Sequence, residues 1–209
     1  CNGVHEPKST QLSGIGLFVV FKAGKEIKVG FGSVSNNITP KGIKEAFQKA
    51  KRNKVYDPDF KTLPVPTGKP VLENYHDNAV MEISDAAIVD LGWQGLKGAI
   101  TEYNQKRFNK SIIVGGDVTI IKERMAIAST KGIDDFDESS ILTTNITSMI
   151  EKEQVKGTGW NTSTHLSRFN PEEAGCESAE SAIKTMGGER ISSGTYNVVF
   201  GRQPVTDLF

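Results

Sequence analysis

The stretch NPEEAGCESAESAIKTMG, residues 170–187, marks the start and end of a helix more completely than any other part of this chain. Asn170 is followed by a proline and, three positions on, by Glu173, a variant of the capping box at a helix N-terminus. Gly187 stands where the left-handed residue that ends a helix is expected. Residues 195–200, TYNVVF, have the pattern of a strand, and only nine residues follow them. We therefore expect this chain to be a piece of a longer protein.

Charge and hydropathy argue against two classes of partner. The chain has 25 Lys and Arg residues and 25 Asp and Glu residues, so its net charge is zero. A nucleic-acid binder usually carries excess positive charge, so direct nucleic-acid contact is not expected. No apolar run is long enough to cross a membrane and no stretch resembles a signal peptide, so membrane contact is not expected either. Because residue 1 is Cys, we expect an upstream segment to be missing. A mature lipoprotein that acts as a binding module is the weaker alternative.

Residues 1–56 are predicted to form a hairpin and helix subdomain that lacks its front end. A strand over 15–22, a turn over 23–25 and a strand over 27–32 fit the alternation of apolar residues. Glycines at the ends of these strands suggest bends or bulges. Thr39 and Pro40 then begin a helix as N-cap and first-turn residue. Its predicted apolar face comprises Ile43, Ala46, Phe47 and Ala50, and its lysines are expected to be a solvated face.

Residues 57–79 are a proline-rich connector, and 80–190 are predicted to form a helix, sheet and helix subdomain. A helix capped by Ser84 or Asp85 runs to about Phe108. Its three glycines, Gly92, Gly95 and Gly98, each cost about 1 kcal/mol relative to alanine, which indicates a neighbour packed close to the backbone.

The following stretch is rich in strands. Strands are predicted over 111–122, 124–129 and 141–150, with a turn at 130–132 and a last strand or ordered loop over 157–167. The helix at 170 has an apolar face made of Ala179, Ala182, Ile183 and Met186. Residues 191–209 are expected to begin a C-terminal domain that is absent. The predicted fold class is α+β, a mostly antiparallel sheet with about three packed helices in two subdomains.

No catalytic, metal-binding or cofactor-binding constellation is evident in these residues, and no peptide-binding residue is assigned. The histidines have no metal-ligand spacing: His5, His76 and His165. His165, among hydroxyl side chains, is expected to bond a neighbouring hydroxyl at a strand end. An acidic cluster is expected in a solvated loop between strands and lacks the spacing of a calcium loop: Asp134, Asp135, Asp137 and Glu138. Trp93 and Trp160 are expected to be packing anchors. Cys1 and Cys176 cannot make a disulfide framework, and Cys176 is expected to be a buried structural thiol.

Taken in order, five segments resemble the TldD/PmbA family, whose members are often labelled modulator of DNA gyrase. These segments are the strand around Asn2–Gly3, the hairpin over 13–34 with its Gly-Phe-Gly-Ser at 30–33, the strand end at 128–133, the alanine-rich helix at 170–186 and the strand at 193–200. The match spans nearly the whole chain. Each motif is short, so the order and spacing carry the resemblance.

The resemblance implies a cytoplasmic prokaryotic protein that acts with a family member as a homodimer or heterodimer. In that family one subunit type bears zinc and cleaves peptides, beside a partner without the full metal motif. The zinc helix, His-Glu-x-x-x-His, follows the Val-Val strand, and this chain ends at Phe209, about where that helix would begin. The family's ligands therefore fall on no residue here. No cofactor is expected in this chain, whereas zinc is implied for the full-length protein or its partner.

Two functional hypotheses follow from the resemblance. In the first, the chain is the non-catalytic portion of a TldD/PmbA-type peptidase in proteolysis or peptide maturation, and supplies a peptide-binding sheet and a partner surface. In the second, it belongs to a subunit of the same family that has no peptidase activity and serves as a binding or scaffold protein. Whether the full-length protein is the zinc-bearing type, and so an enzyme, stays open at this point.

Overall fold

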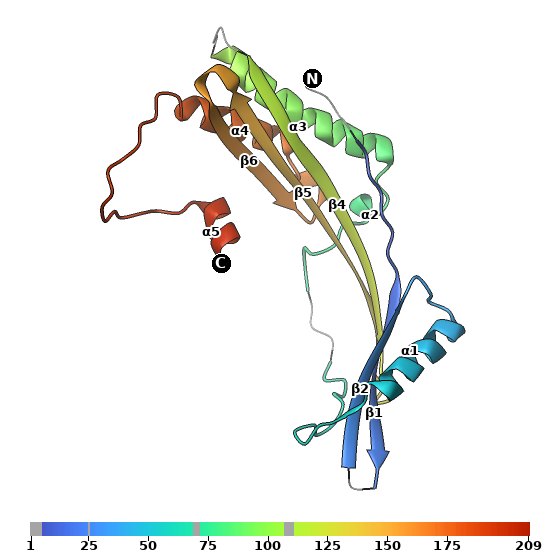
Figure 1. Ribbon diagram of the computed structural model, residues 1–209. Helices are drawn as coiled ribbons and strands as arrows, with labels where there is room; N and C mark the ends of the chain where they lie inside the picture. The colour runs from blue at the N-terminus through green and yellow to red at the C-terminus, as the bar shows by residue number, and fades with distance from the viewer. Residues whose placement is uncertain (1–5, 25, 69–71, 107–110) are drawn as a thin grey trace. The chain divides into compact units, whose positions relative to one another are not determined.

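A computed structural model describes residues 6–24, 26–68, 72–106 and 111–209 of the chain. The chain divides into two compact units. Unit 2 comprises residues 8–66, and unit 1 comprises residues 1–7 and 67–209 (Figure 1). The predicted strand around Asn2, the histidine His5 and the predicted helix end near Phe108 lie outside the described residues.

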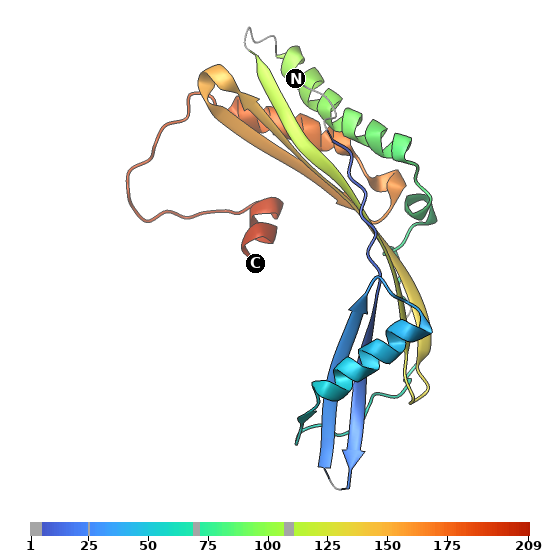
Figure 2. The ribbon, with the colours of Figure 1, turned by 45° about the vertical axis from the view of Figure 1, so that its right-hand side comes forward.

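Unit 2 is a hairpin covered on one face by a helix, as predicted (Figure 2). Strand β1 (Gly14–Ala23) pairs with β2 (Glu26–Ser35), and the short β3 (Val55–Tyr56) extends the sheet on the other side of β2. Gly24 in the turn has φ of +64°, which glycine adopts without strain. The register is continuous from Gly14 to Ala23, so the predicted bends or bulges at the strand glycines are absent from this ladder.

The strand glycines instead make room for helix α1 (Pro40–Arg52). A Cβ atom at Gly30 or Gly32 would overlap a backbone carbonyl of α1. At this short distance only the smallest side chains fit beneath the helix, and Ala46 and Ala50 are fully buried there. Ile43 and Phe47 were predicted to share that face, but they lie beside it and stay 47% and 39% exposed. The predicted N-cap is confirmed, since the Thr39 side chain accepts from the N–H of Gly42.

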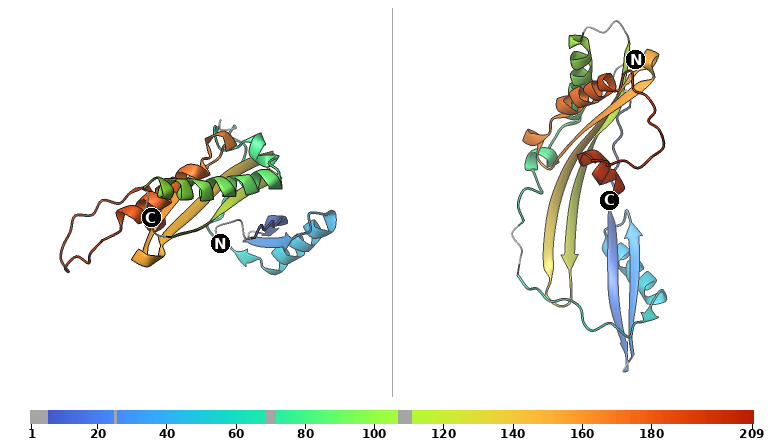
Figure 3. Two further views of the ribbon diagram at one scale, coloured as in Figure 1. Left: turned by 90° about the horizontal axis from the view of Figure 1, so that it is seen from above. Right: turned by 90° about the vertical axis from the view of Figure 1, so that its left-hand side faces the viewer.

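Unit 1 is built on a three-stranded antiparallel sheet in the order β4-β5-β6. Its strands are β4 (Ile112–Ala128), β5 (Asp134–Ile150) and β6 (Val155–Ser163). Two helices, α3 (Asp85–Gln105) and α4 (Pro171–Lys184), pack against each other and cover one face of the sheet (Figures 1 and 3). Short elements complete the unit: α2 (Asn78–Met81), the 3-10 turns Glu151–Glu153 and Leu166–Arg168, and α5 (Arg202–Leu208). The predicted α+β class with three packed helices is confirmed.

The core of unit 1 lies between the helices and the sheet. Leu96, Ala99, Ile146, Ile150 and Ala179 are among its buried members. A second cluster joins Val80, Leu91, Leu142 and Phe169 where α2 meets the sheet. The hydroxyls of Ser148 on β5 and Ser178 on α4 share a hydrogen bond of 2.7 Å inside this interface, which satisfies both groups away from water.

The glycines of α3 have the close neighbour that their cost predicted. A Cβ atom at Gly98 would overlap the carbonyl of Glu172 at the start of α4, and one at Gly95 would lie 3.0 Å from the side chain of Ile146. From the other helix, a Cβ atom at Gly175 would overlap the carbonyl of Gly95. The backbones of α3 and α4 therefore touch, and larger residues at these positions would separate the helices. Gly92 is partly exposed.

Three predictions about the strands are wrong. Residues 112–128 form one strand rather than two, because β5 pairs with them without interruption through Glu123. The acidic cluster lies in β5, not in a loop, since Asp134 already pairs with Ala128. Residues 195–200 form no strand: no strand of the described chain pairs with them, and Val199 is 96% exposed. The turn at 130–132 is confirmed, with φ of +90° at Gly132.

Helix α4 begins and ends as predicted. The N–H of Glu173 donates to the Asn170 side chain at 3.2 Å, and Gly187 has φ of +73°. The reciprocal half of the capping box is replaced by a tertiary contact. Asn161 on β6 accepts from the N–H of Asn170 and donates to the Glu173 carboxylate at 3.2 Å. Its amide thereby connects the start of α4 to the edge strand.

Candidate functional site

The face of the sheet away from the helices is rich in hydroxyl and amide groups. Side chains alternate along each strand, so the residues opposite the core positions share this outer face. We call it the polar face, and its polar members on the three strands are Asp117, Thr119, Thr143, Asn145, Thr147, Lys156, Thr158, Trp160 and Thr162. Partly exposed or exposed side chains of this kind can donate and accept hydrogen bonds without strong preference for one partner. Exposed apolar side chains, among them Ile113, Ile121 and Ile141, share this face.

Strand β6 is an edge of this sheet. It pairs with β5 from Val155 opposite Ile150 to Ser163 opposite Leu142. In the described part of the chain no strand pairs with its other side. An edge strand presents a row of backbone N–H and C=O groups that can pair with another extended chain.

Helix α4 lies directly beneath β6 because β6 carries glycine where it faces the helix. A Cβ atom at Gly159 would overlap the carbonyl of Ala174 and would lie 2.8 Å from the nitrogen of Ser178. One at Gly157 would overlap the backbone of Ser178 and Ala182. Each two-residue step along the strand thus matches a four-residue step along the helix. The edge strand is held rigidly on the helix by backbone contact.

Two glutamates of α4 flank the outer edge of β6. The side of α4 that carries Gly175 faces α3, and the opposite side carries Glu173 and Glu177. Glu173 reaches Asn161 of β6, and the Cβ atom of Glu177 lies beside Gly159. Both glutamates are exposed, and neither has a cationic partner within the described chain. We call this pair the acidic row.

The 74–77 segment continues the sheet where β6 ends. The N–H of Ser140 on β5 donates to the carbonyl of Tyr75, and the Ser140 hydroxyl accepts from the N–H of Asp77 at 3.0 Å. The Asp77 carboxylate accepts from the N–H groups of Leu166, at 2.8 Å, and Ala79, at 2.9 Å. These two bonds hold the pKa of Asp77 below its usual value, and the bond from Leu166 has the larger effect. The edge of β5 is therefore covered beyond β6 as well.

The described histidines are used in local hydrogen bonds. Nδ1 of His165 lies 3.0 Å from the Thr164 hydroxyl, which confirms the predicted strand-end bond. Nε2 of His76 donates to the Asn78 side chain at 2.9 Å and lies 3.9 Å from the Glu138 carboxylate. Its Nδ1 is buried and makes no hydrogen bond with the described residues.

The acidic residues of β5 enter separate contacts, and Asp134 and Asp137 are exposed, as expected of a solvated cluster. Glu138 pairs across the strands with Arg124 at 2.6 Å. Asp137 accepts from the hydroxyl of Tyr75 at 2.9 Å, and this bond raises the pKa of Tyr75. Within the described ranges, no three His, Cys, Asp or Glu side chains converge on a point where a metal ion could bind. The described residues therefore do not fit a zinc site.

The tryptophans and Cys176 differ in part from expectation. Trp93 is 48% exposed, so it is not a packing anchor, whereas Trp160 is half-buried on the polar face. Cys176 is partly buried, and its thiol lies 3.6 Å from the carbonyl of Gly98. Burial, reinforced by the nearby Glu102 and Glu172 carboxylates, raises the pKa of this thiol. A raised pKa lowers the fraction of thiolate, which is the nucleophilic form of cysteine.

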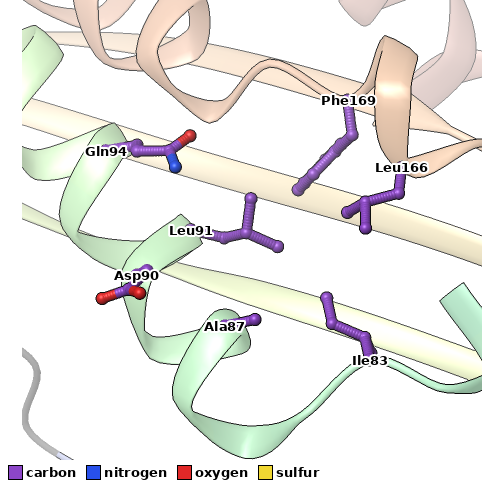
Figure 4. A pocket seen from close by; sticks show the side chains of 7 residues that line it. All are labelled: Ile83, Ala87, Asp90, Leu91, Gln94, Leu166 and Phe169. Atoms are coloured by element: carbon purple, nitrogen blue, oxygen red, sulfur yellow. The ribbon is translucent and has the colours of Figure 1, made fainter. Parts of the chain in front are cut away.

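A hollow of about 360 Å³ opens between α3 and the turn that precedes α4 (Figure 4). Ile83, Leu91, Leu166 and Phe169 point toward one another across it, while Asp90 and Gln94 stand on the α3 side. The walls are apolar and continuous with the second core cluster. No convergent set of polar groups makes it a catalytic pocket.

The neutral net charge of the chain hides a division between the units. Unit 2 has eleven Lys and Arg residues against four Asp and Glu residues, and the rest of the chain has fourteen against twenty-one. Unit 1, which contains β6 and the acidic row, is therefore strongly acidic. The absence of nucleic-acid contact stays a prediction, because the argument from net charge does not apply to unit 2 alone. No helix among the described residues is both long and apolar enough to cross a bilayer.

Sequence reasoning missed the edge position of β6, the acidic row and the Asp77 bonds. The alternation Gly157-x-Gly159 in a strand was a usable signal, since glycine inside a strand often marks a close backbone approach. Asp77 was a second usable signal, because aspartate is a preferred N-cap residue and here precedes a short helix that starts at Asn78. The position of the acidic row could not be found from sequence, because it depends on which side of α4 faces α3.

The sequence matches no protein-family model and has no significant match among curated proteins. Solved structures do resemble it. A proposed modulator of DNA gyrase from Thermotoga maritima matches at 19% identity and TM-score 0.58, over 88% of this chain and 44% of that one. A proposed modulator of DNA gyrase from Bacteroides thetaiotaomicron matches at 13% identity and a TM-score of 0.59, over 88% of this chain and 46% of that protein. TldE from Thermococcus kodakarensis matches at 19% identity and a TM-score of 0.54, over 77% of this chain and 36% of that protein.

This chain spans less than half the length of each of these three proteins. At such low identity the likeness concerns the fold. The fold agrees with the resemblance to the TldD/PmbA family in sequence. The chain therefore has a TldD/PmbA-like fold, that of TldE and of the proposed modulators of DNA gyrase.

Proposed function

We propose that this chain is the non-catalytic portion of a TldD/PmbA-type peptidase that acts in cytoplasmic proteolysis or peptide maturation. Its part is to bind an extended peptide along β6 and to present a surface to a partner subunit of the same family. The observation that carries the proposal is the edge position of β6 in its sheet. Two helices pack on one face of that sheet and hold it in place.

Strand addition gives affinity for a peptide without demanding one sequence. The main-chain groups of β6 would bond the main chain of the peptide, and its alternate side chains would point to opposite sides of the sheet. On one side they would meet Thr158, Trp160 and Thr162 of the polar face. A peptidase that matures varied peptides needs such backbone recognition. The contact of β6 with α4 keeps the edge in place while a peptide binds.

The partner surface has support in unit 2. The face of its sheet away from α1 carries Phe18 and Phe31, which are 51% and 57% exposed and lie directly opposite each other in the hairpin. The ring of Phe60 lies 6.2 Å from that of Phe18. Exposed aromatic residues in a cluster are typical of protein contact surfaces. A homodimer or heterodimer with a family member would cover them.

The alternative is a family member that has no peptidase activity and serves as a binding or scaffold subunit. Both functions use the same edge strand, so peptide binding does not separate them. The sequence encoded beyond Phe209 would distinguish the peptidase from the scaffold. An intact His-Glu-x-x-x-His there, with zinc and peptide hydrolysis in the full-length protein, supports the peptidase. Its absence supports the scaffold.

Peptide binding by the 209-residue chain tests the proposal. The probe is a fluorescent eight-residue peptide of alternating valine and glutamine, measured by anisotropy. Saturable binding is expected, and peptides N-methylated at residues of both edges should bind more weakly, because neither edge then keeps its full row of donors. Equal binding of the methylated peptides would contradict strand addition. Zinc analysis of the same chain should show no stoichiometric metal, and zinc held by its own histidines would contradict the non-catalytic assignment.

A further inference from the structure

The edge of β6 is flanked by charge on one side only. On the helix side stand Glu173 and Glu177, and on the polar face stand Thr158, Trp160 and Thr162. A strand docked on this edge would send every second side chain toward the helix side. Those side chains would therefore meet a different chemistry from their neighbours.

The spacing of the acidic row matches that of alternate residues in a strand. Glu173 and Glu177 are four residues apart on a helix, a rise of about 6 Å. Alternate residues of an extended strand are about 6.6 Å apart. Along β6 the two glutamates lie at successive alternate positions, Glu173 beside Asn161 and Glu177 beside Gly159.

The charge of the acidic row is not cancelled by its surroundings. Glu180, one turn further along α4, is paired with Lys184 at 3.0 Å, and this bond lowers the pKa of Glu180. Glu173 accepts only a neutral amide from Asn161. The cation on β6 itself, Lys156, lies on the polar face near the other end of the strand. The acidic composition of unit 1 adds a field of the same sign.

We propose that the β6 edge selects peptides with lysine or arginine at two alternate positions, whose cationic side chains face Glu173 and Glu177. This inference rests on the proposed function, because it assigns the peptide class that binds at the proposed edge. Because α4 packs directly on Gly157 and Gly159, its outer side lies close to the sheet edge, and long cationic side chains of a docked strand can reach the carboxylates there. Solvent-exposed pairs of this kind give modest selectivity.

The test compares three eight-residue peptides in which valine alternates with lysine, glutamine or glutamate. An alternating peptide can place either set of side chains toward α4, so its register need not be known. At low salt the lysine peptide should bind about fivefold more tightly than the glutamine peptide, and the glutamate peptide more weakly than both. The difference should shrink as the salt concentration rises.

Two variants of the chain locate the effect. Glu173→Gln with Glu177→Gln should leave the glutamine peptide unchanged and abolish the preference for lysine. Glu82→Gln with Glu189→Gln removes the same charge from two exposed positions outside the acidic row and should keep that preference. A preference that survives the first variant, or disappears equally in the second, would overturn the inference. Equal binding of the lysine and glutamine peptides would overturn it while leaving the proposed function intact. If neither peptide binds, the proposed function itself fails.

Discussion

Replacing Gly159 with alanine should destabilise unit 1, because the backbone of α4 occupies the space that a side chain would need. The added methyl group would overlap the carbonyl of Ala174 and would lie 2.8 Å from the nitrogen of Ser178 and 2.9 Å from the Cβ atom of Glu177. Ordinary contacts begin near 3.4 Å. Because the carbonyl of Ala174 lies closest, strand and helix must move apart by about one ångström, and overpacking of this kind costs about 1–3 kcal/mol.

Gly115 provides the matched control in the same sheet. It lies in β4 on the outer face, and a Cβ atom there would have nothing within 4 Å. Gly115→Ala should be neutral or should stabilise by up to about 1 kcal/mol, because glycine loses more backbone entropy on folding.

Urea unfolding followed by tryptophan fluorescence measures both variants, and Trp160 on β6 reports on the strand concerned. We expect Gly159→Ala to lower the free energy of unfolding by about 2 kcal/mol with an unchanged denaturant slope. If Gly159→Ala proves as harmless as Gly115→Ala, then α4 does not lie against β6 as described, and the placement of the acidic row beside the edge is refuted with it.

Three further predictions concern single interactions. Asp77→Asn should lower the free energy of unfolding by roughly 1 kcal/mol at neutral pH. Because folding lowers the pKa of Asp77, the stabilisation by its carboxylate is complete above the unfolded pKa near 4 and is lost as the pH falls through the folded pKa. The stabilities of variant and parent should therefore converge in acid unfolding curves. Ser178→Ala should cost about 1–3 kcal/mol by leaving the buried Ser148 hydroxyl without its partner, whereas Ser148→Ala should cost less, because the Ser178 hydroxyl still donates to the carbonyl of Gly175. The double variant should cost less than the sum of the two, and strict additivity in denaturation would exclude the shared bond. In a Cys1→Ser background, Cys176 should react with a disulfide reagent more slowly than a free thiol and with a titration midpoint above the usual range, and rapid reaction at pH 7 would contradict its burial.

The local structure of the chain is well encoded in its sequence. The caps at Thr39, Ser84 and Asn170 each use a side chain and a backbone group within three residues, so the pattern alone predicted where α1, α3 and α4 begin. The glycines of α3 predicted a close neighbour for the same local reason, since three unfavourable residues in one helix need a packing explanation.

The parts that sequence reasoning missed depend on contacts between distant residues. The acidic residues of β5 look like a loop by composition, but pairing with β4 extends the strand through them, and Arg124 offsets one of the charges. For residues 195–200 the error is the reverse, because a strand was predicted where the structure has none. Their alternation suits a strand, yet a strand needs a partner, and the described chain supplies none. Likewise, the edge position of β6 is a property of the whole sheet.

Hydrogen exchange of the β6 backbone measures the central claim most directly. With the valine and glutamine peptide at saturation, the account predicts slower exchange of outward-pointing amides within residues 155–163, while the amides that pair β4 with β5 keep their rates. Protection confined to other segments, or none at β6 despite saturable binding, would show that the peptide does not add to this edge and would contradict the account.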